Sequence, residues 1–168
     1  EMIDLAEAAL LLAALDLPDA DLSPYRRHLA EIAADVADAM SDAEDTLDAR
    51  VAALQQVIGD RHGYIGDSET YDDLDNANLV RVIDRRRGLP VALGILYLHA
   101  ARAQGWRAFG INFPGNFLVA VEDDEERVIL DPFDRGAQVD IASLRTLLKT
   151  ALGIEAELRP AHYATMTN

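Results

Sequence analysis

Apolar residues recur at helical spacing through the first third of the chain. Met2–Leu15 is apolar on most sides, which predicts a helix buried between others. Ser23 and Pro24 have the pattern of an N-cap followed by a proline at the first helical position. A third helix is predicted further on, with Ser41 or Asp42 as its cap. The predicted apolar faces of the second and third helices are Leu29, Ile32, Ala33, Val36, Ala37 and Met40, then Leu47, Val51, Leu54 and Ile58.

The middle of the chain predicts a helix at the centre of the fold. Gly59–Asn76 is a polar segment that we expect to be a loop. Asn76–Arg87 has the pattern of a short helix, ended by Gly88. Leu89–Gln104 is a nearly all-apolar helix that ends at Gly105. Because such a helix needs cover on every side, we place it at the centre.

The last third predicts strands followed by one more helix. Trp106–Phe113, Asn116–Glu122 and Arg127–Leu130 are expected to form an antiparallel meander, in which the acidic turn EDDEER joins the last two strands. Ile141–Leu152 is predicted to be a helix, and Ile154–Leu158 a short edge strand. This order of elements predicts an α+β fold in which one central buried helix packs on a small antiparallel sheet.

The length of 168 residues indicates one domain. We place this domain at residues 1–159, with an N-terminal helical part at 1–60 and a core at 71–159. Residues 160–168 have no pattern and are expected to be a linker or tail, as in a piece of a longer protein.

Charge limits the partners that we expect. Fifteen Lys and Arg against thirty Asp and Glu give a net charge of −15, which repels nucleic acid and anionic lipid. The apolar run Ala8–Leu15 follows acidic rather than basic residues, unlike a signal peptide. The run Leu89–Leu98 is too short to span a bilayer. We therefore expect a cytoplasmic protein without nucleic acid or membrane partners.

The chain also lacks cysteine, which excludes disulfides, thiolate metal sites and a cysteine nucleophile within it. The stretch YDDLDNAN, from Tyr71, spaces carboxylates as a calcium loop does. However, the loop glycine is missing and Asp84 stands where a bidentate glutamate is needed. We expect Asp75 to cap the helix that begins at Asn76 instead. No metal site and no cofactor are predicted.

Five motifs in the second half occur in a recognisable order. They are an Asn-containing helix, an Arg-rich turn with Gly-x-Pro, an apolar helix, the corner PGNF and the turn DPFDRG. Over Tyr71–Gly136 this order resembles the transglutaminase-like domain of the SirB1 family. The resemblance implies a papain-like or transglutaminase-like core.

The parent chemistry implied by this resemblance is a Cys-His-Asp triad. Its thiolate lies at the start of the central helix, its histidine on the first residues of the second strand, and its aspartate on the next strand. Aligned in this way, Pro90 stands at the cysteine position, Asn116 at the histidine position and Asp131 at the aspartate position. The Gly-x-Pro replacement is usual in the family, whereas its corner commonly reads PGHF. Because a proline cannot attack and an amide does not accept a proton near neutral pH, no intact catalytic set is predicted.

Each of these residues also has an ordinary structural explanation. Asn116 could hydrogen-bond Asp131 across neighbouring strands, or its amide could close the Pro-Gly turn. For Asp131 we favour a cap on backbone N–H groups of the Asp-Pro-Phe turn. His62, in the preceding loop, could swing toward the site, but a loop histidine is usually solvated.

Four further residues complete the candidate set. Arg85, Arg86 and Arg87 could bind an acid or phosphate, but in so acidic a chain we favour pairing with Asp and Glu. Asn76 matches a motif residue of the family, and its role cannot be derived from the sequence. The predicted binding residues are Asn116, Asp131, Pro90, Arg87 and Asn76.

The leading functional hypothesis is a catalytically inactive transglutaminase-like domain that binds a protein or peptide segment or acts as a regulatory module. The alternative is an amidase, protease or transamidase that uses unrecognised groups. A third hypothesis is a structural element of a larger chain. The sequence leaves the oligomeric state and the partner open.

Overall fold

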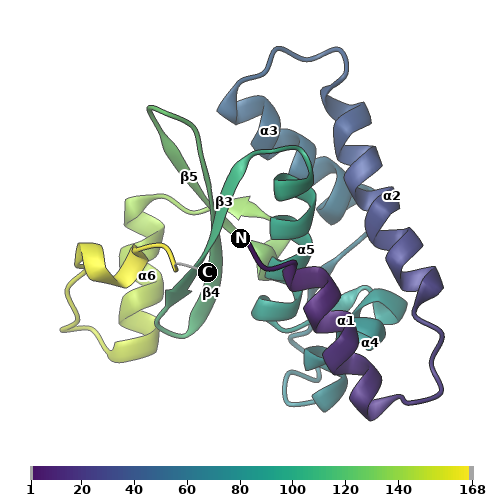
Figure 1. The fold of residues 1–168 in the computed structure, drawn as a ribbon. Helices are drawn as coiled ribbons and strands as arrows, with labels where there is room; N and C mark the ends of the chain where they lie inside the picture. Colours follow the sequence, from purple (N-terminus) through teal and green to yellow (C-terminus); the bar gives the residue numbers. More distant parts are fainter. Residues whose placement is uncertain (1, 167–168) are drawn as a thin grey trace.

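The computed structural model describes residues 2–166, so the first residue of the predicted domain and the last two of the predicted tail lie outside the described residues. The fold is layered (Figure 1). The helix α5 (Pro90–Ala103) lies between a sheet and the helices of the first half, and α6 (Ile141–Leu152) covers the other face of the sheet. The predicted α+β class and the predicted central helix on a small antiparallel sheet are confirmed.

The first half supplies α1 (Leu5–Asp16), α2 (Ser23–Met40), α3 (Leu47–Leu54) and α4 (Leu79–Arg85). A π-helical turn, Gln55–Arg61, continues α3 without a break. The predicted apolar faces of α2, α3 and the π-helical turn supply these buried residues: Leu29, Ile32, Val36, Leu47, Val51, Leu54 and Ile58.

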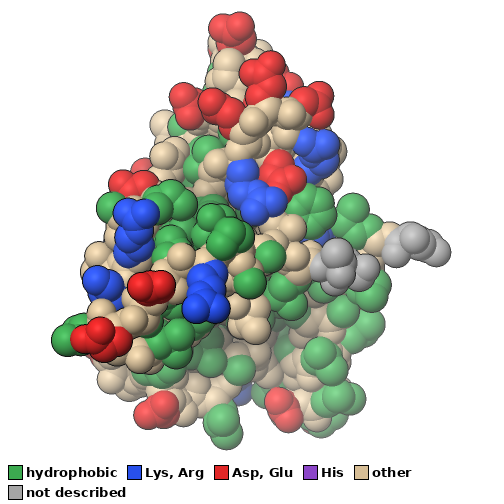
Figure 2. All heavy atoms as spheres, turned by 90° about the vertical axis from the view of Figure 1, so that its left-hand side faces the viewer, with side chains coloured by type: hydrophobic (Ala, Val, Ile, Leu, Met, Phe, Trp, Pro, Cys, Tyr) green, Lys and Arg blue, Asp and Glu red, His purple; other side chains and the backbone are tan. Residues whose placement is uncertain are grey.

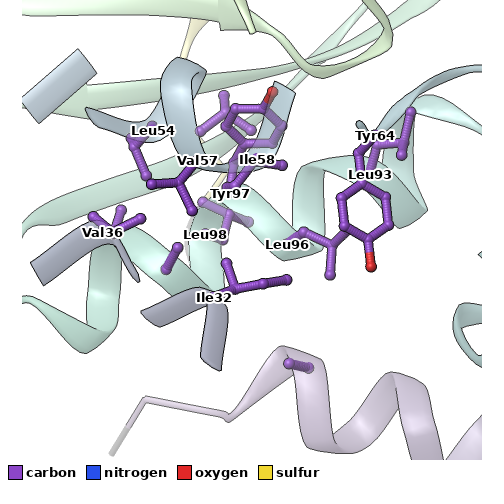
Figure 3. Close-up of a cluster of buried hydrophobic side chains, with 14 of the residues drawn as sticks. Ile32, Val36, Leu54, Val57, Ile58, Tyr64, Leu93, Leu96, Tyr97 and Leu98 are labelled. Carbon is purple, nitrogen blue, oxygen red and sulfur yellow. The ribbon is translucent and has the colours of Figure 1, made fainter. Parts of the chain in front are cut away.

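The burial of α5 follows from its composition. Pro90 stands at the first helical position, where its missing N–H removes no helical bond, and Gly105 ends the segment with a φ of +78°. Figure 3 shows Leu93, Leu96 and other side chains of α5 packed among residues of α2 and the π-helical turn. Each fully buried leucine of this kind contributes about 2 kcal/mol to folding.

Four antiparallel strands form the main sheet in the order β3 (Arg107–Phe113), β4 (Asn116–Glu122), β5 (Arg127–Asp131) and β6 (Ala137–Gln138). The first three match the predicted meander. The two-residue β6 was not predicted, because so short a strand carries no hydrophobic period. The strand β4 is nearly all apolar because α5 covers one face of the sheet and α6 covers the other.

The end of the chain differs from the prediction. The helix α6 has the predicted bounds, but residues 154–158 form no strand, and Ile154 is 80% exposed. A 3-10 turn, η4 (Pro160–Tyr163), then packs against β3, and the backbone N–H of Met166 donates to the carbonyl of Gly110 at 2.8 Å. As far as residue 166, the predicted linker or tail therefore lies on the sheet. Figure 2 shows this side of the molecule, with acidic side chains gathered at the top.

The prediction that the first helix is buried between others is wrong. Only one face of α1, which includes Leu10, packs on α2, α4 and α5. Leu11, Leu12 and Leu15 on the other face are 53% to 77% exposed. The composition predicted cover on all sides, but the described residues cover α1 from one side only.

Two predicted helix caps are also wrong. The side chain of Thr46, not Ser41 or Asp42, accepts a hydrogen bond from the first turn of α3. Asn78, not Asp75, caps α4 in the same way. Each cap lies directly before the first helical residue. The sequence-based predictions placed the starts of both helices a few residues too early.

At α2 the prediction of Ser23 as the N-cap is wrong, because the residue at that position is Leu22, which makes no side-chain capping bond. The helix begins at Ser23 itself, and the Asp21 carboxylate accepts the backbone N–H of Ser23 at 3.0 Å.

The segment Gly59–Asn76, predicted to be a polar loop, is partly ordered into short elements. The two-residue strand β1 (Ile65–Gly66) pairs in parallel with β2 (Arg87–Gly88). A 3-10 turn, η2 (Leu74–Ala77), precedes α4. The helix α4 ends at Arg85, and the residue that stops it is Arg86, with a φ of +60°, and not Gly88 as predicted.

The strained backbone of Arg86 is held by a half-buried polar cluster. Its guanidinium donates to the Tyr64 hydroxyl, which lies 2.7 Å from Nε2 of His28. Nε2 of His62 lies 2.7 Å from the Asp35 carboxylate, and the two imidazole rings pack edge to face at 5.2 Å. His62 thus points into this cluster and not toward the site that its loop position suggested.

The cluster predicts a pH dependence of stability. Burial first, and then the charges of Arg86 and His62, lower the pKa of His28 to about 4, although Glu31 opposes the shift. Since an unfolded histidine has a pKa of about 6.5, the unfolded chain binds a proton between these values that the folded chain refuses. We therefore expect stability to fall as the pH drops from about 6.5 to about 4.

The matched variant is His28→Gln, which keeps an acceptor but does not titrate. Its melting temperature, measured between pH 7 and pH 4, should fall less steeply than that of the wild type. Parallel curves for the two proteins would show that His28 does not carry the effect.

Candidate functional site

A groove with a volume of about 310 Å³ lies between the start of α5 and the corner that joins β3 to β4. All of its lining residues are uncharged, and they include Tyr71, Pro90, Val91, Asn112, Asn116 and Phe117. Tyr71 and Val91 are 49% and 53% exposed, so apolar surface borders the opening. The structure therefore brings Pro90 and Asn116, which the resemblance places at the cysteine and histidine positions, into one groove.

The corner places Asn116 at the first position of β4. Phe113 pairs with Asn116 across two turn residues, and Gly115 adopts a φ of +74° that favours glycine. Among the described residues, the Asn116 side chain makes neither predicted hydrogen bond, to Asp131 or within the turn. The register explains the first absence, because Leu130 pairs with Val119 and Asp131 therefore lies nearer Leu118.

Two glycines let Phe117 form the floor of the groove. An ideal Cβ at Gly94 of α5 or at Gly110 of β3 would come within 2.6 Å of the Phe117 ring. The ring therefore lies against both α5 and β3, and a larger residue at either position would clash with it.

Asp131 is turned away from the groove. Its carboxylate accepts the backbone N–H of Phe133 at 3.0 Å, which is the capping role that we favoured. Burial raises the pKa of this carboxyl, and the bond from Phe133 partly opposes that shift. Asp131 lines a separate hollow with Thr146 of α6, so the aspartate and asparagine positions do not form a pair.

Asn76 fixes the loop that carries Tyr71, which forms one side of the groove. The buried amide of Asn76 donates to the carbonyl of Thr70 at 2.6 Å and accepts from Arg85 at 3.3 Å. Its backbone carbonyl accepts the N–H of Leu89, at the start of α5, at 3.0 Å. The role that the sequence left open is therefore structural: Asn76 ties the loop to the start of the central helix.

A buried carboxylate completes this tie. The buried carboxylate of Asp67 accepts hydrogen bonds from the backbone N–H and the hydroxyl of Thr70. It also forms an ion pair with the guanidinium of Arg85, with an N–O distance of 3.0 Å. The Thr70 bonds hold the pKa of Asp67 well below its usual range. Pairing with acids is thus confirmed for Arg85, and for Arg87, which lies 3.8 Å from Glu69.

Not every candidate residue lies at the groove. Arg86 serves the histidine cluster, so its predicted pairing with an acid is wrong. Arg87, Asn76 and Asp131 lie outside the lining, whereas Pro90 belongs to it. The sequence missed Tyr71 because it lay in a segment that looked like solvated loop.

Within residues 2–166, no group of His, Asp or Glu side chains is arranged to hold a metal ion. The same residues include no helix that is long and apolar enough to cross a membrane.

Comparisons with known proteins identify the superfamily of the chain. A family described as the transglutaminase-like superfamily matches residues 23–168. The chain belongs to the transglutaminase-like superfamily. No solved structure matched it.

Several curated proteins are similar to this transglutaminase-like chain. A UPF0162 protein of Xylella fastidiosa is 32% identical over 93% of the chain, and a UPF0162 protein of Vibrio cholerae is 32% identical over 100% of it. The chain spans 55% and 62% of the length of these two relatives. F-box only protein 21 of Mus musculus is 28% identical over 57% of the chain, which corresponds to 17% of the mouse protein.

The capping role of Asp131 can be tested with two substitutions. Asp131→Asn keeps an acceptor for the Phe133 N–H and removes a poorly solvated charge, so its melting temperature at pH 7 should equal or exceed that of the wild type. Asp131→Ala removes the acceptor and should cost about 1 kcal/mol. Because the raised pKa favours the protonated form in the folded state, wild-type stability relative to Asp131→Asn should rise as the pH falls. Equal losses in both variants at pH 7 would contradict the cap.

Proposed function

We propose that this chain is a non-catalytic transglutaminase-like domain of the SirB1 type that serves in the cytosol as a protein-binding or regulatory module. The groove between Pro90 and Asn116 is the proposed binding surface, and a peptide segment of another protein is its proposed occupant. The observation that carries the proposal is the retained scaffold of the superfamily around two reactive positions that hold a proline and an asparagine.

The chemistry of the groove supports binding over acyl transfer. Pro90 offers no nucleophilic atom, and the Asn116 amide does not take up a proton near neutral pH. Asp131, the remaining member of the parent triad, caps a turn outside the groove. A groove with uncharged lining and with half-exposed Tyr71 and Val91 at its border is typical of a site for a peptide side chain.

The relatives support a modular use of the domain. In the mouse relative named F-box only protein 21, the similar segment makes up 17% of the protein. In the two bacterial relatives it makes up 55% and 62%. A domain of this kind that recurs within longer chains of different size is suited to recruiting or positioning another polypeptide.

The test places a photo-crosslinking amino acid at Val91, on the rim of the groove, and at Ile154 as an exposed apolar control. In a lysate of the source cells, position 91 should label a defined polypeptide that position 154 does not label. Asn116→Arg, which fills the groove, should reduce the labelling at position 91 at least about fivefold. Mass spectrometry would locate the labelled segment in the partner.

The purified protein should also fail to turn over acyl-amide and glutamine-peptide substrates. Turnover that is lost in Asp131→Ala, together with labelling at position 91 that Asn116→Arg leaves unchanged, would favour the enzyme hypothesis instead.

A further inference from the structure

The strand β3 is the edge of the main sheet next to the groove. Within residues 2–166, the order β3-β4-β5-β6 leaves one side of β3 without a neighbouring strand. The two-residue corner pairs Phe113 with Asn116, so the odd-numbered residues of β3 exchange backbone hydrogen bonds with β4. The N–H and C=O groups of Ala108, Gly110 and Asn112 therefore point away from β4, along the outer edge of the sheet.

Two of these three positions are already covered by the chain itself. The carbonyl of Ala108 accepts a hydrogen bond from the Nε–H of Arg102 at 3.0 Å. The carbonyl of Gly110 accepts one from the backbone N–H of Met166 at 2.8 Å. Met166 thus contacts the edge as a residue of an added strand would. The third position, Asn112, is exposed and lines the groove.

We propose that an extended peptide binds by strand addition at Asn112 of β3, with its side chains entering the groove beside Val91. This inference rests on the proposed function and specifies how the partner binds. Backbone hydrogen bonds to the strand edge would supply affinity whatever the sequence of the peptide. The groove would select which peptide side chains fit.

The surroundings define the chemistry of this peptide. Successive side chains of a strand alternate between its faces, so every second side chain would face the uncharged lining of the groove. Those residues should be apolar and of moderate size. Because the chain carries a net charge of −15, basic residues at the ends of the peptide would strengthen the encounter.

The segment that ends at Met166 should compete with part of this peptide. Asn112 and Gly110 lie two residues apart on one edge, which is roughly 7 Å along a strand. A peptide that extends from Asn112 toward Gly110 must therefore displace the Met166 contact. Releasing that contact should lengthen the accessible edge and tighten binding.

The probe is a fluorescent peptide, Lys-Lys-Val-Thr-Val-Thr-Val-Lys-Lys, titrated into the full chain and followed by fluorescence anisotropy. One copy carries N-methyl groups on its valines and another carries them on its threonines, so each copy lacks the N–H donors of one edge. Strand addition predicts that one copy binds roughly tenfold more weakly while the other stays close to the parent peptide.

Protein variants test the same contact from the other side. Asn112→Pro removes the outward N–H at a strand edge that tolerates proline, and should weaken binding roughly tenfold relative to Asn112→Ala. Met166→Pro removes the donor to Gly110 and should tighten binding a few-fold, whereas Met166→Ala keeps that donor and should not. If Asn112→Pro does not fold, the methylated peptides still decide the question.

Two outcomes would overturn the inference. The first is equal binding of the parent and both methylated peptides, together with loss of binding in Val91→Asp. That result would show that the groove recognises side chains without strand addition, and it would leave the proposed function standing. The second is no binding of the parent peptide to the wild type or to Met166→Pro. The crosslinking at position 91 tests the proposed function separately.

Discussion

The buried amide of Asn76 is the contact on which the geometry of the groove depends. Its side chain joins the carbonyl of Thr70 to the guanidinium of Arg85, and its own carbonyl holds the N–H of Leu89. Asp67 neutralises Arg85 from the other side. Because the side chains of Asn76 and Asp67 are buried, each hydrogen bond that they failed to make would cost about 1–3 kcal/mol, which favours this position of the loop against the start of α5. That position carries Tyr71 to the rim of the groove.

The apolar core explains why the fold needs neither a thiol at position 90 nor an imidazole at position 116. The helix α5 is fixed by buried residues along its whole length, and Phe117 is seated against Gly94 and Gly110. None of these contacts requires a thiol at position 90 or an imidazole at position 116. The fold of this chain is thus stabilised by packing and by the contacts of Asn76, and the side chains at positions 90 and 116 carry little of that stability.

The sequence predicted the long elements well because their periods are strong. The bounds of α6 and β4 agree with the prediction, and the ends of α5 and β3 agree within about one residue. Short elements escaped prediction: two-residue strands such as β1 and β6 have no period, and Arg86 adopts a backbone conformation usually reserved for glycine. The site was predicted in part. Motif order brought Pro90 and Asn116 together, but the burial of Asn76 and the position of Tyr71 depend on side-chain hydrogen bonds between distant segments, which a linear pattern does not encode.

Amide hydrogen exchange of Asn76→Ala, with Asn78→Ala as the matched control, tests the importance of this tie most directly. Asn78 caps α4 close by but makes no side-chain bond to the loop at Thr70. We predict that Asn76→Ala speeds exchange of residues 67–78 and of Leu89 roughly tenfold to a hundredfold, while the middle of α5 and the β3–β4 pair stay protected. Unchanged protection of residues 67–78, or an equal loss throughout the molecule, would contradict the account.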